Sequence, residues 1–150
     1  MIHALIFTLA MAGCPMHDQH VGSQHVDERH DTFGMPHEAV HHNFRLLEDG
    51  GAIELHANAA DDAKTIDAIR SHIREIASDF SRNDFDKPHF VHGRTPDGVK
   101  EMQAQREAIA YAYEELADGA RVRITTKNEK ARDAVHAFLR FQIKDHHTSE

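Results

Sequence analysis

The chain has 150 residues, of which 40% are hydrophobic and 28% are charged, a composition typical of one globular domain with a modest core. Its formal net charge of −8 argues against binding to nucleic acid or to an anionic membrane surface, because both depend on clustered Lys and Arg. Histidine is unusually abundant, at 15 residues, which suggests a role in metal binding or in responding to pH.

Residues 1–14 resemble the signal peptide of a bacterial lipoprotein. The apolar run over residues 4–12 is too short to span a bilayer and fits the h-region of a signal peptide. The Met-Ala-Gly-Cys sequence ending at Cys14 resembles a lipobox, although Met replaces the commoner Leu and no Lys or Arg precedes the run. An N-terminal strand or buried helix is the alternative. Because Cys14 is the only cysteine, it has no internal disulfide partner, and we expect a periplasmic protein anchored to the membrane by a lipid on Cys14.

Residues 15–40 show no helical or strand periodicity and are rich in His, Asp, Gly and Gln, which predicts a flexible tether. Imidazole and thioether groups bind copper and zinc, and thioether favours Cu(I). The candidate metal ligands in this tether and at its end are Met16, His17, His20, His25, His30, Met35, His37, His41 and His42. Affinity should be modest, since ordering a loose chain costs on the order of 1 kcal/mol per residue. A solvated spacer is the alternative.

Residues 41–57 predict a β-hairpin, because Asp49-Gly50 is a strong signal for a two-residue turn. In that register Arg45 lies opposite Glu54 on the solvent-facing side of the hairpin. Four apolar side chains then point to the core: Phe44, Leu46, Ile53 and Leu55.

The same pattern returns 69 residues later, with a turn at Asp118-Gly119 and a charge pair between Glu114 and Arg123. A helix follows each hairpin, over about 63–80 and 129–145, so the chain contains an internal ββα repeat. We therefore predict an α+β domain over residues 41–148. It has two layers and a pseudo-symmetric ββα-ββα order, with a four-stranded antiparallel sheet and the helices on one face.

Residues 81–98 are predicted to form a long loop between the two repeats, of a kind that often carries function. His89 and His92 lie in this loop and would point to opposite sides if the segment were extended. Thr95-Pro96 is typical of a helix start, with threonine as the cap and proline as the first helical residue.

A metal site in the folded domain could combine His41 or His42 with His56 and with His89 or His92. In the predicted register His56 is diagonal to His41 on the solvent-facing side of the hairpin. Two neighbouring imidazoles are too few, because zinc sites use at least three protein ligands. An ordinary set of surface histidines is the alternative.

Residues 88–99 and 121–126, the Gly-Gly pair at Gly50 and the ending 135–146 resemble a family of small, uncharacterised bacterial secreted proteins. The likeness covers residues 33–148 and is most specific at 138–143. The resemblance implies a periplasmic setting and a recurring set of histidines, matched by His41, His42, His92, His136 and His146. Members sometimes carry a transcarbamoylase label, but this chain is about half the size of such a subunit and lacks its phosphate loop.

No nucleophile with a base, paired carboxylates or cofactor motif supports an enzyme. The sequence predicts a periplasmic lipoprotein that binds or buffers copper or zinc through its His/Met-rich leader. The alternative is a non-catalytic interaction module, as a homodimer or with another protein, whose histidines respond to pH. We expect no organic cofactor.

Overall fold

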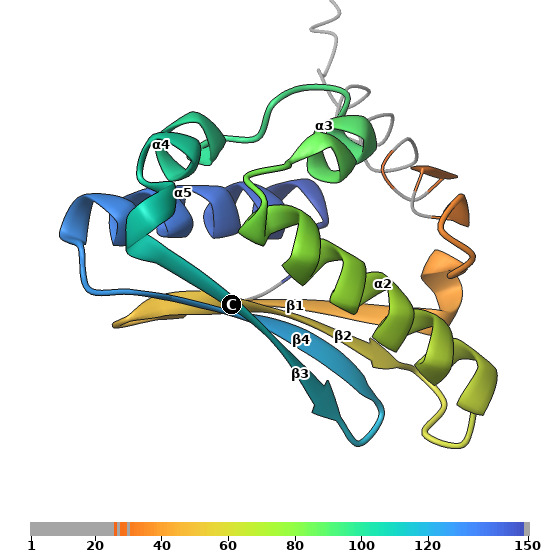
Figure 1. Cartoon of the computed structure of the whole chain (residues 1–150). Helices are drawn as coiled ribbons and strands as arrows, with labels where there is room; N and C mark the ends of the chain where they lie inside the picture. The colour runs from red at the N-terminus through yellow and green to blue at the C-terminus, as the bar shows by residue number, and fades with distance from the viewer. Residues whose placement is uncertain (1–25, 27, 30, 149–150) are drawn as a thin grey trace, which may run out of the picture.

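The computed structural model describes residues 26, 28–29 and 31–148 of the chain (Figure 1). The predictions that concern the signal peptide, Cys14 and most leader ligands lie outside these residues. The leader ligands outside them are Met16, His17, His20, His25 and His30.

Two β-hairpins form one antiparallel sheet. In the first hairpin β1 (Val40–Leu47) pairs with β2 (Gly50–Ala57), and in the second β3 (Ile109–Leu116) pairs with β4 (Gly119–Thr126). β2 and β4 meet in the middle, which gives the strand order β1-β2-β4-β3. The predicted α+β class, four-stranded antiparallel sheet and ββα-ββα order are confirmed.

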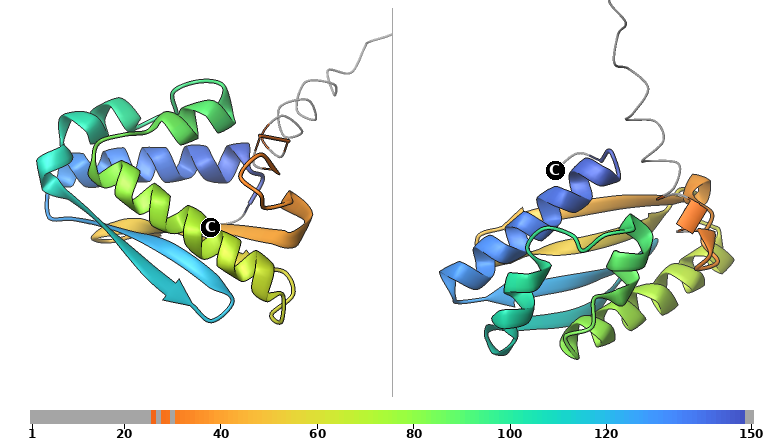
Figure 2. Two further views of the ribbon diagram at one scale, coloured as in Figure 1. Left: turned by 45° about the vertical axis from the view of Figure 1, so that its right-hand side comes forward. Right: turned by 90° about the horizontal axis from the view of Figure 1, so that it is seen from above.

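The helices of the described chain lie on one face of the sheet (Figures 1 and 2). The two long helices are α2 (Ala63–Ser81) and α5 (Glu129–Asp145), close to the predicted ranges. Two short helices, α3 (Asp86–His92) and α4 (Val99–Ala104), lie between them in the sequence. Seen from above, α3 and α4 lie over the space between α2 and α5 (Figure 2).

The long helices begin at side-chain caps and bury the expected apolar stripes. Asp62 accepts a hydrogen bond from the Thr65 N–H at 3.1 Å, and Asn128 accepts one from the Ala131 N–H at 3.0 Å. The buried stripe of α2 consists of Ile66, Ile69, Ile73, Ile76, Ala77 and Phe80. In α5, Val135, Phe138 and Leu139 are fully buried.

The two repeats interlock. α2 packs mainly on β3 and β4, while α5 packs mainly on β1 and β2, so the helix of each repeat covers the hairpin of the other. The backbone N–H of Ala57 donates to Asp118 O at 2.8 Å, and its repeat equivalent, Thr126, donates to Asp49 O at 2.9 Å. The core is therefore shared between the halves.

Both hairpin turns lie one residue earlier than predicted. Leu47 pairs with Gly50, so Glu48 and Asp49 form the first loop. The predicted Arg45–Glu54 pair is wrong, because Arg45 lies opposite Ala52. The pairing of β1 with β2 is shifted by two residues from the predicted pairing. Because side chains alternate between the faces with a period of two, the same side chains still face the core.

The second hairpin is corrected in the same way. Leu116 pairs with Gly119, and Glu114 therefore lies opposite Arg121 and not opposite Arg123. Arg121 Nε donates to Glu114 Oε2 at 2.7 Å.

Close approach between β2 and β4 explains why the glycines follow the turns. A Cβ on Gly50 would lie 2.2 Å from Ile124 O, and one on Gly119 would lie 1.9 Å from Leu55 O. Glycine is therefore required at the first residue of β2 and of β4, where the two hairpins meet. For that reason each Asp-Gly pair, which predicts a turn, lies one residue later than the actual turn.

The predicted long loop over residues 81–98 is partly wrong, because α3 lies within it. This helix buries Pro88 and Val91 and ends at Gly93, whose φ of +66° is a left-handed conformation suited to glycine. α4 begins at Val99 and not at Thr95-Pro96. A helix of seven residues has too few apolar positions for its period to be recognised.

The described part of the segment predicted as a tether packs on the domain instead. Met35 is only 2% exposed and belongs to the core, and Val26 is 4% exposed. A 3-10 helix at His37–Ala39 leads directly into β1, so the domain begins before residue 41. In the part of the chain that the structure describes, no helix has the length and apolarity to cross a membrane.

Candidate functional site

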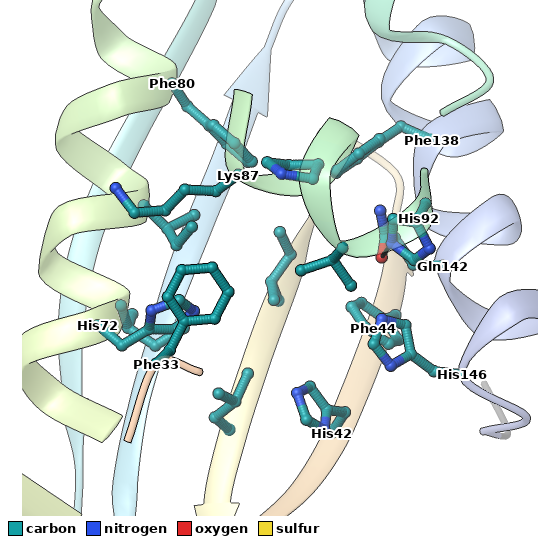
Figure 3. A pocket seen from close by; sticks show the side chains of 16 residues that line it. Phe33, His42, Phe44, His72, Phe80, Lys87, His92, Phe138, Gln142 and His146 are labelled. Carbon is teal, nitrogen blue, oxygen red and sulfur yellow. Dashed lines mark hydrogen bonds between the residues drawn. The ribbon is translucent and has the colours of Figure 1, made fainter. Parts of the chain in front are cut away.

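A pocket lies between the helix-bearing face of the sheet and the helices α2, α3 and α5 (Figure 3). Its cavity has a volume of about 60 Å³. The floor is apolar and is made mainly by six side chains: Ile53, Leu55, Ile73, Ile76, Phe80 and Phe138.

Four histidines line the pocket although they are far apart in the sequence. They come from four places in the fold: His42 from β1, His72 from α2, His92 from the end of α3 and His146 from the residue after α5. The rings of His42 and His146 stack with centroids 5.0 Å apart, and the ring of His92 meets His146 edge-on at 5.2 Å. His72 lies on the opposite wall (Figure 3).

His92 is held from behind by α5. Its side chain is 1% exposed, and its Nδ1 hydrogen-bonds to the carboxylate of Asp145. Its Nε2 lies 2.8 Å from Oε1 of Gln142. These contacts suit an imidazolium that donates both hydrogen bonds, or a neutral ring that accepts from the Gln142 NH2 group after the amide is turned. Both ring nitrogens are thus engaged by α5.

Lys87 is the one lysine that lines the pocket within the described chain, and its charge is directed to α2. Its Nζ hydrogen-bonds to Asp79 and lies 3.7 Å from Glu75. The hydrogen bond to Asp79 raises the pKa of the Lys87 ammonium, so this group stays charged beside the pocket.

One lining residue of the pocket, Phe33, comes from the segment before β1, which we call the strap and define as the described residues from Val26 to Met35. Phe33 of the strap lies 5.0 Å from the ring of His72 and 6.2 Å from the ring of Phe90. Arg29 donates from Nη1 to Phe90 O at 3.1 Å and to Val91 O at 3.2 Å, in the last turn of α3. The strap therefore contacts α3 through Arg29 and Phe33, and it contacts the core through Met35.

The structure separates the histidines predicted to form a site in the domain. His41 and His56 lie opposite each other on the open face of the sheet, and His56 Nδ1 lies 2.9 Å from Asp118 Oδ1. His42 and His92 lie on the other face, in the pocket. Neighbouring residues of a strand point to opposite faces, so His41 and His42 cannot serve one site.

The remaining predicted ligands in the described chain lie apart from the pocket. Met35 is buried in the core, His37 is exposed and hydrogen-bonds Asp31 through its backbone N–H at 2.8 Å, and His89 is exposed near Thr95. No group of three or more His, Cys, Asp or Glu among the described residues is placed to hold a metal ion.

Several pocket residues were missed by the sequence reasoning. No motif in the sequence singles out His72, Lys87 or Gln142, and His72 is only 8% exposed. Of the histidines matched by the family resemblance, His42, His92 and His146 come together. His136 does not, because its Nε2 lies 2.9 Å from the carbonyls of Leu47 and Gly50.

Comparisons with models of protein families, with curated proteins and with solved structures found no match for this chain. The resemblance to a family of secreted proteins stays a prediction.

Proposed function

We propose that this protein binds a small amphipathic molecule in the histidine-lined pocket and releases it unchanged. The observation that carries the proposal is the cavity itself, with an apolar floor between three helices and the sheet and a few polar groups in its wall. Small-molecule sites typically have this composition. A ligand that covers the floor removes apolar surface from water, at about 25 cal/mol per Å².

Binding without reaction fits the chemistry of the wall. Among the described residues that line the pocket there is no Ser, Thr or Cys to act as a nucleophile. His92, the histidine best oriented by a carboxylate, directs both nitrogens to Asp145 and Gln142. A general base must reach the proton that it removes, which favours a positioning role for His92 over a catalytic one.

We propose a periplasmic setting for this binding, with the chain held at a membrane by a lipid on Cys14. The support is the lipobox-like sequence and the short apolar run before it. The strap would then stand between the anchor and the pocket.

The test is a titration of the full chain with 1-hexanol, followed by NMR of isoleucine, leucine and valine methyl groups. We expect saturable shifts of the Ile73 and Ile76 methyl signals, while the Ile143 signal stays in place. The variant Ile76→Phe should fill part of the cavity and weaken binding at least about tenfold, equivalent to about 1.4 kcal/mol.

The matched control is Ile143→Phe, the same substitution on α5 at a partly buried position outside the pocket lining. It should leave hexanol affinity unchanged. The absence of saturable shifts, or an equal effect of both variants, would contradict the proposal; circular dichroism confirms that each variant is folded.

Metal binding by the leader is the second candidate function. It is favoured by the sequence observation that Met16, His17, His20 and His25 lie within ten residues. Calorimetry with Cu²⁺ and Zn²⁺ should then show uptake by the mature chain that is lost when residues 15–25 are deleted. Equal uptake by both forms would overturn this assignment. A pH-responsive interaction with a protein partner remains a prediction of the sequence.

A further inference from the structure

We infer that the ligand of this pocket is uncharged: a neutral molecule with an aliphatic chain, such as an alcohol or an ester, and not a carboxylate or an amine. This inference rests on the proposed function and adds the chemical class of the ligand. It is carried by the charged and polar side chains of the pocket wall, whose partners belong to the protein itself.

Most of the pocket wall is apolar. Ten of the sixteen lining residues have hydrocarbon side chains, which offer a ligand close packing and burial from water but no hydrogen bond. Such a surface suits an aliphatic chain of any origin. The class of the head group is therefore decided by the six polar lining residues, which are Lys87, Gln142 and four histidines.

The charge of Lys87 is paired with α2. Its Nζ hydrogen-bonds to Asp79 and lies 3.7 Å from Oε2 of Glu75, and Figure 3 shows the ammonium turned to α2. Asp79 is only 8% exposed. An anionic ligand that drew the ammonium away would leave this carboxylate with the exposed Arg82 as its remaining ion-pair partner. The loss of one partner from a nearly buried ion pair opposes anion binding.

His92 is paired with α5 in a similar way. Its side chain is 1% exposed, its Nδ1 hydrogen-bonds to Asp145, and its Nε2 lies 2.8 Å from Oε1 of Gln142. Gln142 is itself only 5% exposed. The imidazole and the amide oxygen are thus engaged with each other, and a charged ligand would have to break these contacts to use them.

The other three histidines of the wall pack against aromatic rings. His72 lies 5.0 Å from Phe33, and Phe44 lies 6.1 Å from His42 and 5.3 Å from His146, measured between ring centroids. Each of the three also has a further interaction within the protein. They add ring surface to the wall, against which an aliphatic chain can pack.

The charges beside the pocket therefore compensate each other. Glu75 and Asp79 contact Lys87, Asp145 contacts His92, and none of these three carboxylates lines the pocket. An anion in the pocket would find the ammonium already paired, and a cation would find these carboxylates already paired. Burying a charge without a partner of opposite sign costs far more than burying a hydroxyl group. A neutral ligand avoids that cost.

The test compares three ligands of equal chain length, 1-hexanol, hexanoate and hexylamine, on the full chain at about pH 7.5, where the carboxylate and the amine are both charged. Affinities are measured from the methyl signals of Ile73 and Ile76. We expect hexanol to bind at least fivefold more tightly than either charged ligand. A smaller difference would overturn the inference and leave the proposed function standing. If none of the three ligands gives saturable shifts, both fail.

The variant Asp79→Asn removes a carboxylate that compensates Lys87, so it should raise the affinity for hexanoate relative to hexanol at least threefold. The matched control is Asp67→Asn, which removes the same charge from an exposed position of α2 outside the pocket lining and should leave this ratio unchanged. An equal ratio in the two variants would overturn the inference, because paired charges are its basis. The ligand comparison on the unaltered chain decides the matter even if Asp79→Asn does not fold.

Discussion

Gly119 shows how a single residue controls the meeting of the two hairpins. Its missing side chain lets β4 lie against β2, where a Cβ would be 1.9 Å from the carbonyl oxygen of Leu55. Gly50 has the same role at the repeat-related position. The two glycines are thus packing residues at the centre of the sheet.

Replacing Gly119 by Ala should lower the free energy of unfolding by about 1–3 kcal/mol, because backbone must shift to relieve the contact. Urea unfolding followed by circular dichroism measures the change. As control, Ala112→Val adds atoms at an exposed position of β3 and should change stability by less than about 0.5 kcal/mol. Equal stability of Gly119→Ala and the unaltered chain would show that β2 and β4 are less close.

The neighbouring histidines at positions 41 and 42 illustrate what the sequence could predict at this scale. Strand alternation alone assigns His41 and His42 to opposite faces. Which of them meets His92 and His146 depends on where α3 and the end of α5 lie, and no local pattern encodes that. Buried His72 could have been suspected from its place beside the apolar stripe of α2.

Among the elements, the strap contacts α3 through the side chains of Arg29 and Phe33. Arg29 donates to two carbonyls in the last turn of α3, where the helix leaves acceptors without helical partners. Arg29 lies four residues before Phe33, which lines the pocket.

The variant Arg29→Ala should loosen the strap and the end of α3. Since a hydrogen bond of this kind contributes about 1 kcal/mol, backbone amides of residues 31–35 and 89–92 should exchange with solvent about fivefold faster. Hydrogen exchange with mass spectrometry measures this. The control Arg45→Ala removes an exposed arginine from the open face of the sheet and should leave both segments as protected as before. Unchanged exchange in Arg29→Ala would mean that the other contacts of the strap, among them those of Phe33 and Met35, hold it in place without Arg29.

α5 depends on its cap. Asn128→Ala removes the side-chain acceptor for the Ala131 N–H and should lower the free energy of unfolding by about 1 kcal/mol. Lys127→Ala, one residue earlier and outside the cap, should have an effect below about 0.5 kcal/mol. Urea unfolding of both variants checks this; a cap variant as stable as the control would contradict it.

Elements with a strong period were predictable, and short ones were not. The hairpins and the long helices follow from alternation, turn residues and apolar stripes, and their ranges are close to those predicted. α3 has seven residues and contains a proline, so its sequence resembles a loop. Residues of α3 line the pocket. Because this helix was not predicted, the pocket was not predicted either.

At the scale of the whole molecule, three carboxylates link stability to pH, of which Asp49 is exposed and Asp62 and Asp118 are partly buried. Hydrogen bonds from Arg123, Thr65 and His56 lower the pKa values of Asp49, Asp62 and Asp118, respectively, below the ordinary value of 3.8. A lowered pKa in the folded state means that the stabilisation is present above the unfolded-state pKa and is lost as pH falls through the folded-state value.

The melting temperature should therefore fall as the pH is lowered from 5 to about 2.5. The double variant Asp49→Asn, Asp118→Asn should show a flatter dependence over the same range, because two of the linked groups no longer titrate. Calorimetric scans measure both curves. A melting temperature that stays constant below pH 4 in the unaltered chain would show that these hydrogen bonds do not form in solution.

The shared core explains why whole-molecule features were only partly predictable. The repeat predicted one sheet with the helices on one face, and this is confirmed. The exchange of helices between the repeats, and the pocket that it creates between α2 and α5, depend on contacts between distant segments.

The most direct measurement is an NMR experiment that detects contacts between 1-hexanol and the full, isotope-labelled chain. We expect contacts from the terminal methyl group of hexanol to Ile73 and Ile76, which line the pocket. Contacts to His41 and His56 on the open face, or no contacts at saturating hexanol, would contradict the assignment of this pocket as the binding site.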